Sequence, residues 1–347
     1  MGAVAFILIV AAAAFDTAAL DDVVQQTPGI VAVVVDSGGE PVYARQVRPG
    51  STRGPRKEAI DGLHDIRSAG KSITALAVGA AIADGHLASV DVAVWPLLGV
   101  TEGPHQGIRV RDLLTMSSSL ACDDWQGRRS PGFEERMYRH RNWVDFASRL
   151  PADPAYERNA DGFGRFAYCT AGVFLLGQVV QAATGEPFDA YVRRRLFEPL
   201  GVGEVVWRRS RSGEVQAGGQ LQIAATDLAK LGRLVLDGGR WQGEQVLPEA
   251  WIEQMLQPWR AIGPDGYGYL WWSRMAQGPQ GAERLWFMRG NGGNLVVLIG
   301  SLDTVVVVQA ANYNDPAATE VSFAVVTAAL TALGPDGRSP VGSEAIP

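Results

Sequence analysis

Apolar residues gather in short runs near both ends of the chain, and turn residues separate these runs. Residues 29–35 and 41–45 are rich in β-branched and other apolar side chains and flank Asp36-Ser-Gly-Gly39, which predicts a β-hairpin. After residue 263 the same pattern predicts four more strands, over residues 267–272, 285–288, 294–299 and 304–309. The two ends of the chain therefore supply the strands.

Most of the remaining segments have the spacing of amphipathic or buried helices. Helices are predicted over residues 20–26, 71–83, 110–116, 168–184, 188–197, 226–236 and 317–333. The helix over residues 168–184 should end at Gly185, and Thr226 should cap the start of the helix over residues 226–236.

Strands at both ends with helices between them imply one discontinuous α/β domain that holds a helical domain. We expect the α/β domain to comprise residues 17–75 and 255–347, and the helical domain to comprise residues 76–254. The sequence contains no repeat and no low-complexity segment. An active site should lie in the cleft between the two parts.

Residues 2–14 form an uncharged apolar block that is too short to span a bilayer comfortably but suits the core of a signal peptide. We therefore expect residues 1–16 to be a signal peptide and the protein to be exported, periplasmic or secreted, with no firm membrane anchor. The block lacks the usual positively charged start, so a mis-assigned start codon or a buried first helix are the alternatives.

The charge distribution excludes several classes of partner. The net charge is −6 without a long run of like charge, which argues against nucleic acid, because phosphate binding needs a basic stripe. The four histidines are scattered without metal-ligand spacing, so we expect no metal or other cofactor; they are His64, His86, His105 and His140. The G-x-S-x-G pentapeptide of α/β-hydrolases is absent from the sequence.

A serine and a lysine three residues apart offer a nucleophile with its own base. Ser68 and Lys71 would lie on one face of a helix, close enough for the amine to reach the hydroxyl. The chain has 31 basic residues, of which only three are lysines, and Lys71 opens a run without another ionisable residue until Asp84. Apolar surroundings favour the neutral amine, which can accept the serine proton. The alternative is a helix-capping serine followed by a surface lysine.

Two cysteines, Cys122 and Cys169, leave the redox state open. An even count in an exported chain permits one intramolecular disulfide, and a bridge here would tie together two loops. Two separate buried thiols explain the sequence equally well.

Several stretches, in this order and spacing, carry a resemblance to one superfamily. They are Ser68-Ala-Gly-Lys71, the segment 110–119, Tyr168-Cys-Thr170, Leu196-Phe-Glu-Pro-Leu-Gly201, Gly218-Gly219 before Thr226-Asp-Leu228, and Gly290-Asn-Gly-Gly-Asn294. The chain resembles serine β-lactamases and D-alanyl-D-alanine carboxypeptidases, in the branch of class C β-lactamases, related esterases and amide hydrolases such as 6-aminohexanoate-dimer hydrolase. The resemblance implies a β-lactamase/transpeptidase-like α/β fold, with an antiparallel sheet flanked by helices and an inserted helical domain.

The resemblance also implies roles for three side chains. Ser68 and Lys71 match the nucleophile and base of S-x-x-K, and Tyr168 matches the tyrosine of Y-x-N, which shares the proton transfers. Thr170 stands where the family has Asn, a residue that contacts the substrate amide in β-lactamases. This departure weakens any expectation of β-lactam cleavage and leaves the acyl-transfer residues in place.

A glycine-rich segment aligns with the third family motif, K-T-G. Asn291, Gly292 and Gly293 would line the substrate site, and the backbone N–H groups of Ser68 and Asn294 would form the oxyanion hole. The motif lysine is missing, and Arg289 either replaces it as the group that grips a substrate carboxylate or is a solvated surface charge.

One loop aromatic completes the expected site. Trp125 should contact the ligand from a loop near the cleft, whereas Asp123 and Asp124 beside it are expected to be surface residues.

Taken together, these residues predict an exported serine hydrolase that forms an acyl-enzyme on a small-molecule or peptide-like ester or amide. The alternative is a catalytically weak sensor that captures a penicillin or a peptidoglycan-like ligand, which the two lost motif residues favour. Because one fold hosts lactam, ester and linear-amide cleavage, the shape of the pocket must decide the substrate.

Overall fold

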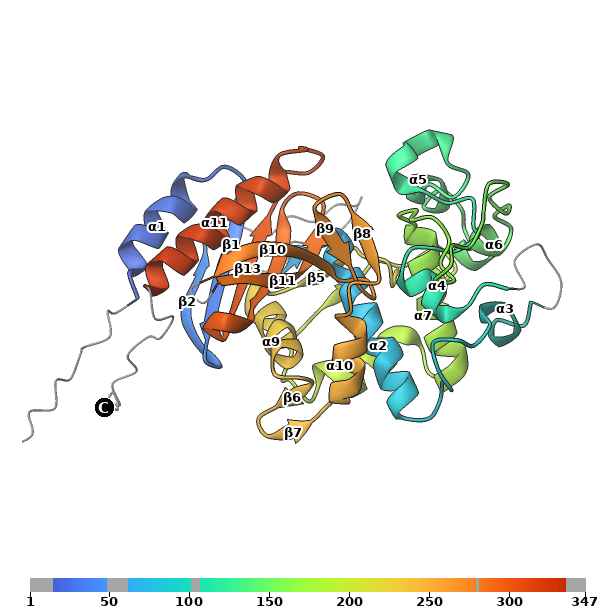
Figure 1. Cartoon of the computed structure of the whole chain (residues 1–347), viewed down its shortest axis with the longest axis horizontal. Coiled ribbons are helices and arrows are strands. Elements are labelled where there is room, and N and C mark those ends of the chain that lie inside the picture. The colour runs from blue at the N-terminus through green and yellow to red at the C-terminus, as the bar shows by residue number, and fades with distance from the viewer. Residues whose placement is uncertain (1–14, 49–61, 101–106, 279–280, 335–347) are drawn as a thin grey trace, which may run out of the picture.

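The computed structural model describes residues 15–48, 62–100, 107–278 and 281–334 (Figure 1). The apolar block over residues 2–14 and His105 lie outside these ranges. Among the described residues, no helix combines the length and the apolar character that a membrane crossing requires.

An eight-stranded antiparallel sheet forms one half of the molecule, in the strand order β2-β1-β13-β12-β11-β10-β9-β8. Its strands are β1 (Ile30–Ser37), β2 (Glu40–Gln46), β8 (Arg260–Ile262), β9 (Asp265–Tyr267), β10 (Trp272–Gly278), β11 (Gly281–Gly290), β12 (Asn294–Ile299) and β13 (Thr304–Ala310). The predicted N-terminal hairpin is present as β1 and β2, with Ser37 opposite Glu40. The predicted antiparallel sheet with flanking helices is confirmed.

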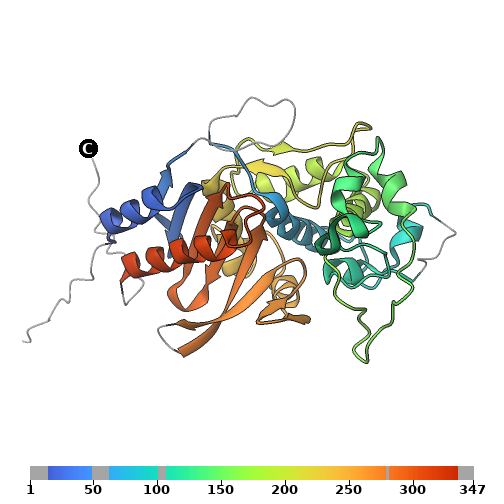
Figure 2. The same cartoon turned by 90° about the horizontal axis from the view of Figure 1, so that it is seen from above.

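Helices cover both faces of this sheet. The helices α1 (Thr17–Gln26) and α11 (Ala318–Leu333) lie side by side on one face, and α9 (Ala225–Leu236) lies on the other (Figures 1 and 2). A Cβ at Gly232 of α9 would lie 2.6 Å from a methyl group of Val305, so this glycine lets the helix approach β13 closely. α9 thus packs on the sheet although its residues fall in the range expected for the helical domain.

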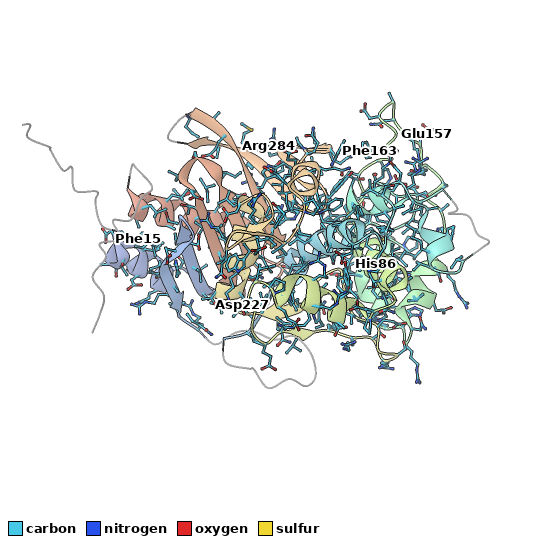
Figure 3. The ribbon with its side chains drawn as sticks, turned by 90° about the horizontal axis from the view of Figure 1, so that it is seen from below. Phe15, His86, Glu157, Phe163, Asp227 and Arg284 are labelled. Atoms are coloured by element: carbon cyan, nitrogen blue, oxygen red, sulfur yellow. A yellow bond between two sulfur atoms is a disulfide. The ribbon has the colours of Figure 1, made fainter. Side chains whose placement is uncertain are left out.

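The helical half lies beyond the short strands β8 and β9. It is built from α3 (Val94–Leu97), α4 (Val110–Leu114), α5 (Glu134–Met137), α6 (Trp143–Ser148), α7 (Thr170–Thr184), α8 (Phe188–Val192), the 3₁₀ turn η2 (Asp124–Arg129) and the π turn η3 (Arg193–Phe197). Figure 3 marks His86, Glu157 and Phe163 in this half and Phe15 at the opposite end of the molecule.

Shorter elements complete the fold. They are β3 (His64–Asp65), β4 (Val206–Trp207), β5 (Leu221–Ile223), β6 (Arg240–Trp241), β7 (Glu244–Gln245), α10 (Glu249–Met255) and the 3₁₀ turn η4 (Gly300–Leu302). The strands β3, β5 and β4 form a small antiparallel sheet, and β6 pairs with β7.

The helix α2 (Lys71–Ala83) runs between the sheet and the helical half (Figure 1), and eleven of its residues are buried. Its many alanines, together with Gly79, allow neighbours to pack close on every side: a Cβ at Gly79 would lie 2.1 Å from the indole nitrogen of Trp251. The 3₁₀ turn η1 (Arg67–Gly70) leads directly into α2. This arrangement fixes the start of α2, where Ser68 and Lys71 lie, at the junction of the two halves.

Two helix starts differ from the prediction. α7 begins at Thr170 rather than Tyr168, with Cys169 as its N-cap, because the Cys169 sulfur accepts a hydrogen bond from the Gly172 N–H. α9 begins at Ala225, so Thr226 is inside the helix and does not cap it.

Candidate active site

Ser68 and Lys71 are in hydrogen-bond contact at the start of α2. Lys71 Nζ lies 2.9 Å from Ser68 Oγ and also donates to the Gly218 carbonyl oxygen at 2.7 Å. The Lys71 side chain is almost fully buried, with 1% of its surface exposed. Both contacts orient the buried amine, because a buried polar group is stable only when it is hydrogen-bonded.

Residues 217–219, just before β5, pack against the Ser68–Lys71 pair. Thr74 Oγ1 donates to the Ala217 carbonyl at 2.6 Å, one helical turn beyond Lys71. Gly219, with φ of +139°, brings its backbone so close to η1 that a Cβ would lie 2.7 Å from the Arg67 carbonyl oxygen. The Gly218-Gly219 pair thus supplies an acceptor to Lys71 and a close backbone contact to the nucleophile turn.

Tyr168 approaches the pair from the loop before α7. Lys71 Nζ lies 5.0 Å from the centroid of the Tyr168 ring, and the side chain is buried. Within the described ranges the Tyr168 hydroxyl makes no hydrogen bond to Ser68 or Lys71. The structure therefore brings the three predicted residues together, with the Lys71 amine over the tyrosine ring.

Aromatic rings form one wall of the site. The rings of Trp125 and Tyr168 are parallel, with centroids 5.5 Å apart, and Trp272 packs against both, at 6.3 Å and 6.1 Å. The indole of Trp125 is 59% exposed, so one of its faces is available at the rim. Such an exposed aromatic surface next to a polar centre suits contact with an apolar part of a ligand.

These residues line a cleft of about 340 Å³. Its walls are Ser68, Asp124, Trp125, Phe133, Glu134, Tyr168, Thr170, Trp272, Arg289, Gly290, Asn291, Gly292, Asp315, Pro316, Ala318 and Thr319. A smaller cavity of about 170 Å³ adjoins it, and Ser68, Glu134 and Asn291 line both. Ser68 therefore lines two neighbouring cavities.

The turn between β11 and β12 supplies another part of the cleft wall. A Cβ at Gly290 would lie 2.0 Å from the Ile66 carbonyl oxygen, so only glycine allows β11 to contact η1 here. Asn291 lies in the turn rather than on the strand, and its amide nitrogen donates to Asn314 Oδ1 at 3.0 Å.

Two residues that were expected at this wall lie behind it. Asn294 is buried, and its side chain donates to the Asn291 carbonyl and accepts from the Ala310 N–H. Gly293 packs on α11, where Ser322 Oγ donates to its carbonyl at 2.7 Å. Neither residue lines the cleft, whereas Gly290, Asn291 and Gly292 do.

Arg289 and Thr170 both line the cleft. Arg289 is half-buried, with its guanidinium carbon 5.2 Å from the centroid of the Trp272 ring. Arg289 places a positive charge in the cleft wall, which also contains the carboxylates of Asp124, Glu134 and Asp315.

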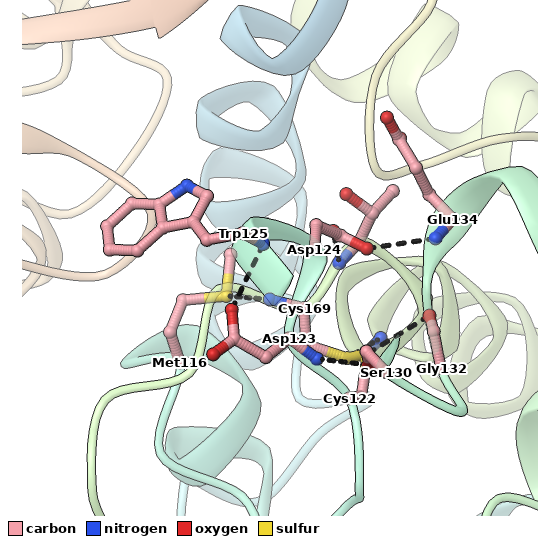
Figure 4. Close-up of a disulfide and its surroundings, with 11 residues drawn as sticks. Met116, Cys122, Asp123, Asp124, Trp125, Ser130, Gly132, Glu134 and Cys169 are labelled. Carbon is pink, nitrogen blue, oxygen red and sulfur yellow. Dashed lines mark hydrogen bonds between the residues drawn. A yellow bond between two sulfur atoms is a disulfide. The ribbon is translucent and has the colours of Figure 1, made fainter. Parts of the chain in front are cut away.

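Cys122 and Cys169 form a disulfide, with their Cα atoms 5.3 Å apart (Figure 4). Both residues are buried. Since Cys169 directly follows Tyr168, and Cys122 precedes the Asp123-Asp124-Trp125 segment, the bridge joins the two loops that carry the aromatic wall.

Asp123 and Asp124 are not surface residues, contrary to the sequence interpretation. Asp123 is buried and its carboxylate accepts from the Trp125 N–H at 3.1 Å, and Asp124 is partly buried at the cleft wall. The polar character of the loop alone suggested exposure. Asp124 is two residues from Cys122, and Tyr168 is next to Cys169, so a disulfide between the two cysteines would have placed Asp124 near Tyr168. The Gly218 carbonyl was also missed, because backbone acceptors leave no trace in side-chain patterns.

Comparison with known proteins identifies the family. The Beta-lactamase family model matches residues 16–329. The 6-aminohexanoate-dimer hydrolase of Paenarthrobacter ureafaciens is 27% identical over 233 residues, which are 62% of this chain and 58% of that protein. The chain thus spans little more than half the length of this relative.

Solved structures share the fold. The penicillin binding protein from Bacillus halodurans is 21% identical with a TM-score of 0.67, over 89% of this chain and 99% of that chain. EstCE1, a hydrolase with promiscuous acyltransferase activity, is 17% identical with a TM-score of 0.70, over 90% of this chain and 97% of that chain. With the family match over nearly the whole chain, these likenesses agree with the β-lactamase/transpeptidase-like fold expected from the motifs, and the chain belongs to the Beta-lactamase family.

Proposed function

We propose that the protein is a serine hydrolase that cleaves ester or linear amide substrates through an acyl-enzyme. The observation that carries this proposal is the 2.9 Å contact between Lys71 Nζ and Ser68 Oγ at the base of an open cleft. A buried amine in contact with a hydroxyl is the arrangement that activates a serine nucleophile.

The proposed reaction assigns one role to each of the three polar groups. Ser68 Oγ attacks the substrate carbonyl and its proton passes to Lys71. Tyr168 helps to return a proton to the leaving alcohol or amine as the tetrahedral intermediate collapses. Water then attacks the acyl-enzyme and releases the acid, which restores Ser68.

The oxyanion hole of this proposal uses the backbone that faces the cleft. The N–H of Ser68 is one donor, and a backbone N–H of the Gly290–Gly292 segment replaces that of Asn294 as the second, because Asn294 is buried behind the turn. Trp125, Thr170, Arg289, Asn291 and Gly292 contact the substrate in this scheme.

The substrate class follows from the relatives and from the departures in the motifs. The name of the 6-aminohexanoate-dimer hydrolase describes a linear amide substrate, and Thr170 replaces the asparagine that contacts the amide of a β-lactam. We therefore place the protein among the class C β-lactamase-like esterases and amidases, with cleavage of esters and linear amides preferred to that of β-lactams. The disulfide favours export to an oxidising compartment.

A fluorophosphonate probe tests the nucleophile directly. Ser68→Ala should abolish covalent labelling and lower ester hydrolysis on the order of 10³-fold or more, with the far-UV spectrum unchanged. Ser72→Ala is the matched control, since Ser72 is on the same helix but donates to the Leu270 carbonyl outside the cleft. Labelling that persists in Ser68→Ala contradicts the proposal.

A substrate panel separates the hydrolase from the sensor. A hydrolase should turn over p-nitrophenyl esters or the 6-aminohexanoate dimer continuously and cleave nitrocefin and D-Ala-D-Ala peptides more slowly. A sensor should give one equivalent of acyl-enzyme and then stop.

A further inference from the structure

Asp124 makes backbone hydrogen bonds to the residues on both sides of Cys169. Its backbone N–H donates to the Tyr168 carbonyl at 2.7 Å, and its carboxylate Oδ2 accepts from the Thr170 N–H at 2.8 Å. The same side chain accepts from the Glu134 N–H through Oδ1 at 2.9 Å, as Figure 4 shows. One aspartate therefore fixes the backbone on both sides of Cys169 and ties it to the start of α5.

The hydrogen bonds of Asp124 also orient its carboxylate. The Thr170 N–H is at the first turn of α7, where unpaired N–H groups and the helix dipole favour a negative charge. Both carboxylate oxygens are thus occupied by backbone donors on the cleft wall, which sets the direction of the carboxylate.

Charged and titratable groups surround this carboxylate from each neighbouring element. Glu134 and Tyr138 face it from the α5 segment, and Lys71 faces it from the start of α2. Burial and the Glu134 carboxylate raise the pKa of Asp124 to about 6, while the charge of Lys71 and the hydrogen bond from Thr170 act in the opposite direction. The carboxylate and the Lys71 amine therefore interact electrostatically.

We propose that Asp124 is a positioning residue for acyl transfer, which holds the Tyr168–Thr170 backbone and stabilises the Lys71 ammonium that forms when Ser68 gives up its proton. The inference rests on the proposed function and adds a residue to it. Asp124 acts through Tyr168 and Lys71, and it does not need to touch the reacting carbonyl. A fixed negative charge near a developing cation lowers the barrier without reorganisation during the reaction.

The sign of the pH dependence follows from this role. Above the pKa of about 6, Asp124 is ionised and can accept from both backbone N–H groups while stabilising the Lys71 cation. Below it, the carboxyl group is neutral, its negative charge is lost, and one oxygen carries a proton. Acylation of Ser68 should therefore slow as the pH falls through about 6.

The test measures the second-order rate of Ser68 labelling by an uncharged fluorophosphonate across this pH range. In Asp124→Asn the rate above neutral pH should fall about 10- to 100-fold. The acid limb should move to lower pH, because the carboxyl group that titrates at about 6 is gone. For a turnover substrate, the loss should appear in kcat rather than in KM.

Two further variants isolate the effect. Asp124→Ser also removes the titrating carboxyl and leaves a small polar side chain, so it should show the same shift of the acid limb, which covers the case that Asp124→Asn does not fold. Asp123→Asn is the matched control, because the Asp123 carboxylate bonds to Trp125 and Gln126 and leaves the Tyr168–Thr170 backbone untouched. Its labelling rate should stay within about 3-fold of the wild type, with the same acid limb.

Three outcomes overturn the inference. The first is a folded Asp124 variant that labels Ser68 at the wild-type rate with an unchanged acid limb. The second is a uniform loss at every pH that Asp123→Asn reproduces, since this indicates loop damage alone. The third is wild-type labelling that stays constant between about pH 7 and pH 5. A wild type without any Ser68-dependent labelling instead refutes the proposed function itself.

Discussion

The indole of Trp125 stacks on the phenol ring of Tyr168, with an angle of 4° between the two rings and 5.5 Å between their centroids. Trp125, one of the most exposed large apolar side chains among the described residues, is thus stacked on buried Tyr168, which is part of the proposed proton pathway. Substrate that covers the free face of the indole would lie next to the Tyr168 ring. In the proposed reaction, a substrate bound on the indole would therefore lie beside the residue proposed to transfer the proton.

Trp125→Ala should weaken substrate binding. Loss of an aromatic contact costs about 1 kcal/mol or more, so KM should rise about 5- to 10-fold, with a smaller decrease in kcat as Tyr168 loses its stacking partner. Trp125→Phe should restore most of the affinity. Steady-state kinetics on an ester with an aromatic or long apolar group checks this. Met275→Ala is the control, since Met275 is 51% exposed on β10 outside the cleft; an equal effect there would refute a specific role of Trp125.

Arg289→Gln should discriminate between substrates by charge. If the guanidinium grips a substrate carboxylate, kcat/KM for an ester with a free carboxylate should fall about 10- to 100-fold, while a neutral isostere should change by less than about 3-fold. Arg284→Gln on the same strand is the matched control, because Arg284 donates to Ser273 Oγ and does not line the cleft. Equal losses for the charged and neutral esters would show that Arg289 is not a carboxylate site.

Removal of the disulfide should destabilise the protein and slow it. Cys122→Ser with Cys169→Ser opens a link across 47 residues, for which chain entropy predicts a loss of about 4 kcal/mol in the free energy of unfolding. Urea denaturation should show this, and kcat should fall because the loops of Asp124 and Tyr168 are then joined by hydrogen bonds alone. Thiol titration of the unfolded, unreduced wild type provides the control: two reactive thiols would show that the bridge does not form.

Gly290→Ala should affect both stability and activity. A Cβ at this position would lie 2.0 Å from the Ile66 carbonyl oxygen, so β11 must move away from η1, at a cost of about 1–3 kcal/mol. The shift widens the space between the turn and Ser68, so ester hydrolysis should fall more than the melting temperature alone accounts for. Gly300→Ala is the control, since a Cβ added there would have no neighbouring atom within 4 Å. A Gly290→Ala enzyme with wild-type activity would exclude a close approach of this turn to the nucleophile.

Local patterns predicted most of the framework, although the strand predicted over residues 267–272 was wrong, because residues 268–271 connect β9 to β10. The apolar runs gave strands that match β1, β12 and β13, and the helix over residues 317–333 matches α11 within one residue. Periodicity reports which residues of one segment share a face, and this information is sufficient for elements that bury a whole face. The position of α9 on the sheet could not be obtained in this way, because its amphipathic pattern shows that one face is covered and does not show by what.

The contacts of the candidate site were predicted in part. The spacing of Ser68 and Lys71 was sufficient to predict their contact, because both lie within one helical turn. The second partner of Lys71, the Gly218 carbonyl, comes from 147 residues along the chain, and no local rule indicates it. Asp124 was assigned to the surface because loops are usually exposed, yet its hydrogen bonds to residues 134 and 170 place it at the cleft wall.

The sheet brings together the two extremes of the described chain: Ser37 on β1 lies opposite Thr304 on β13, and Ile30 lies opposite Ala310. After Ser68 and Lys71 have been translated, residues 72–303 must still be made before synthesis reaches β13, which pairs with β1. Long-range pairing of this kind slows folding and leaves strand edges unpaired in the meantime. The nascent protein therefore carries Ser68 and Lys71 long before β13 can pair with β1, so the complete sheet beside these two residues can form only after β13 has been made.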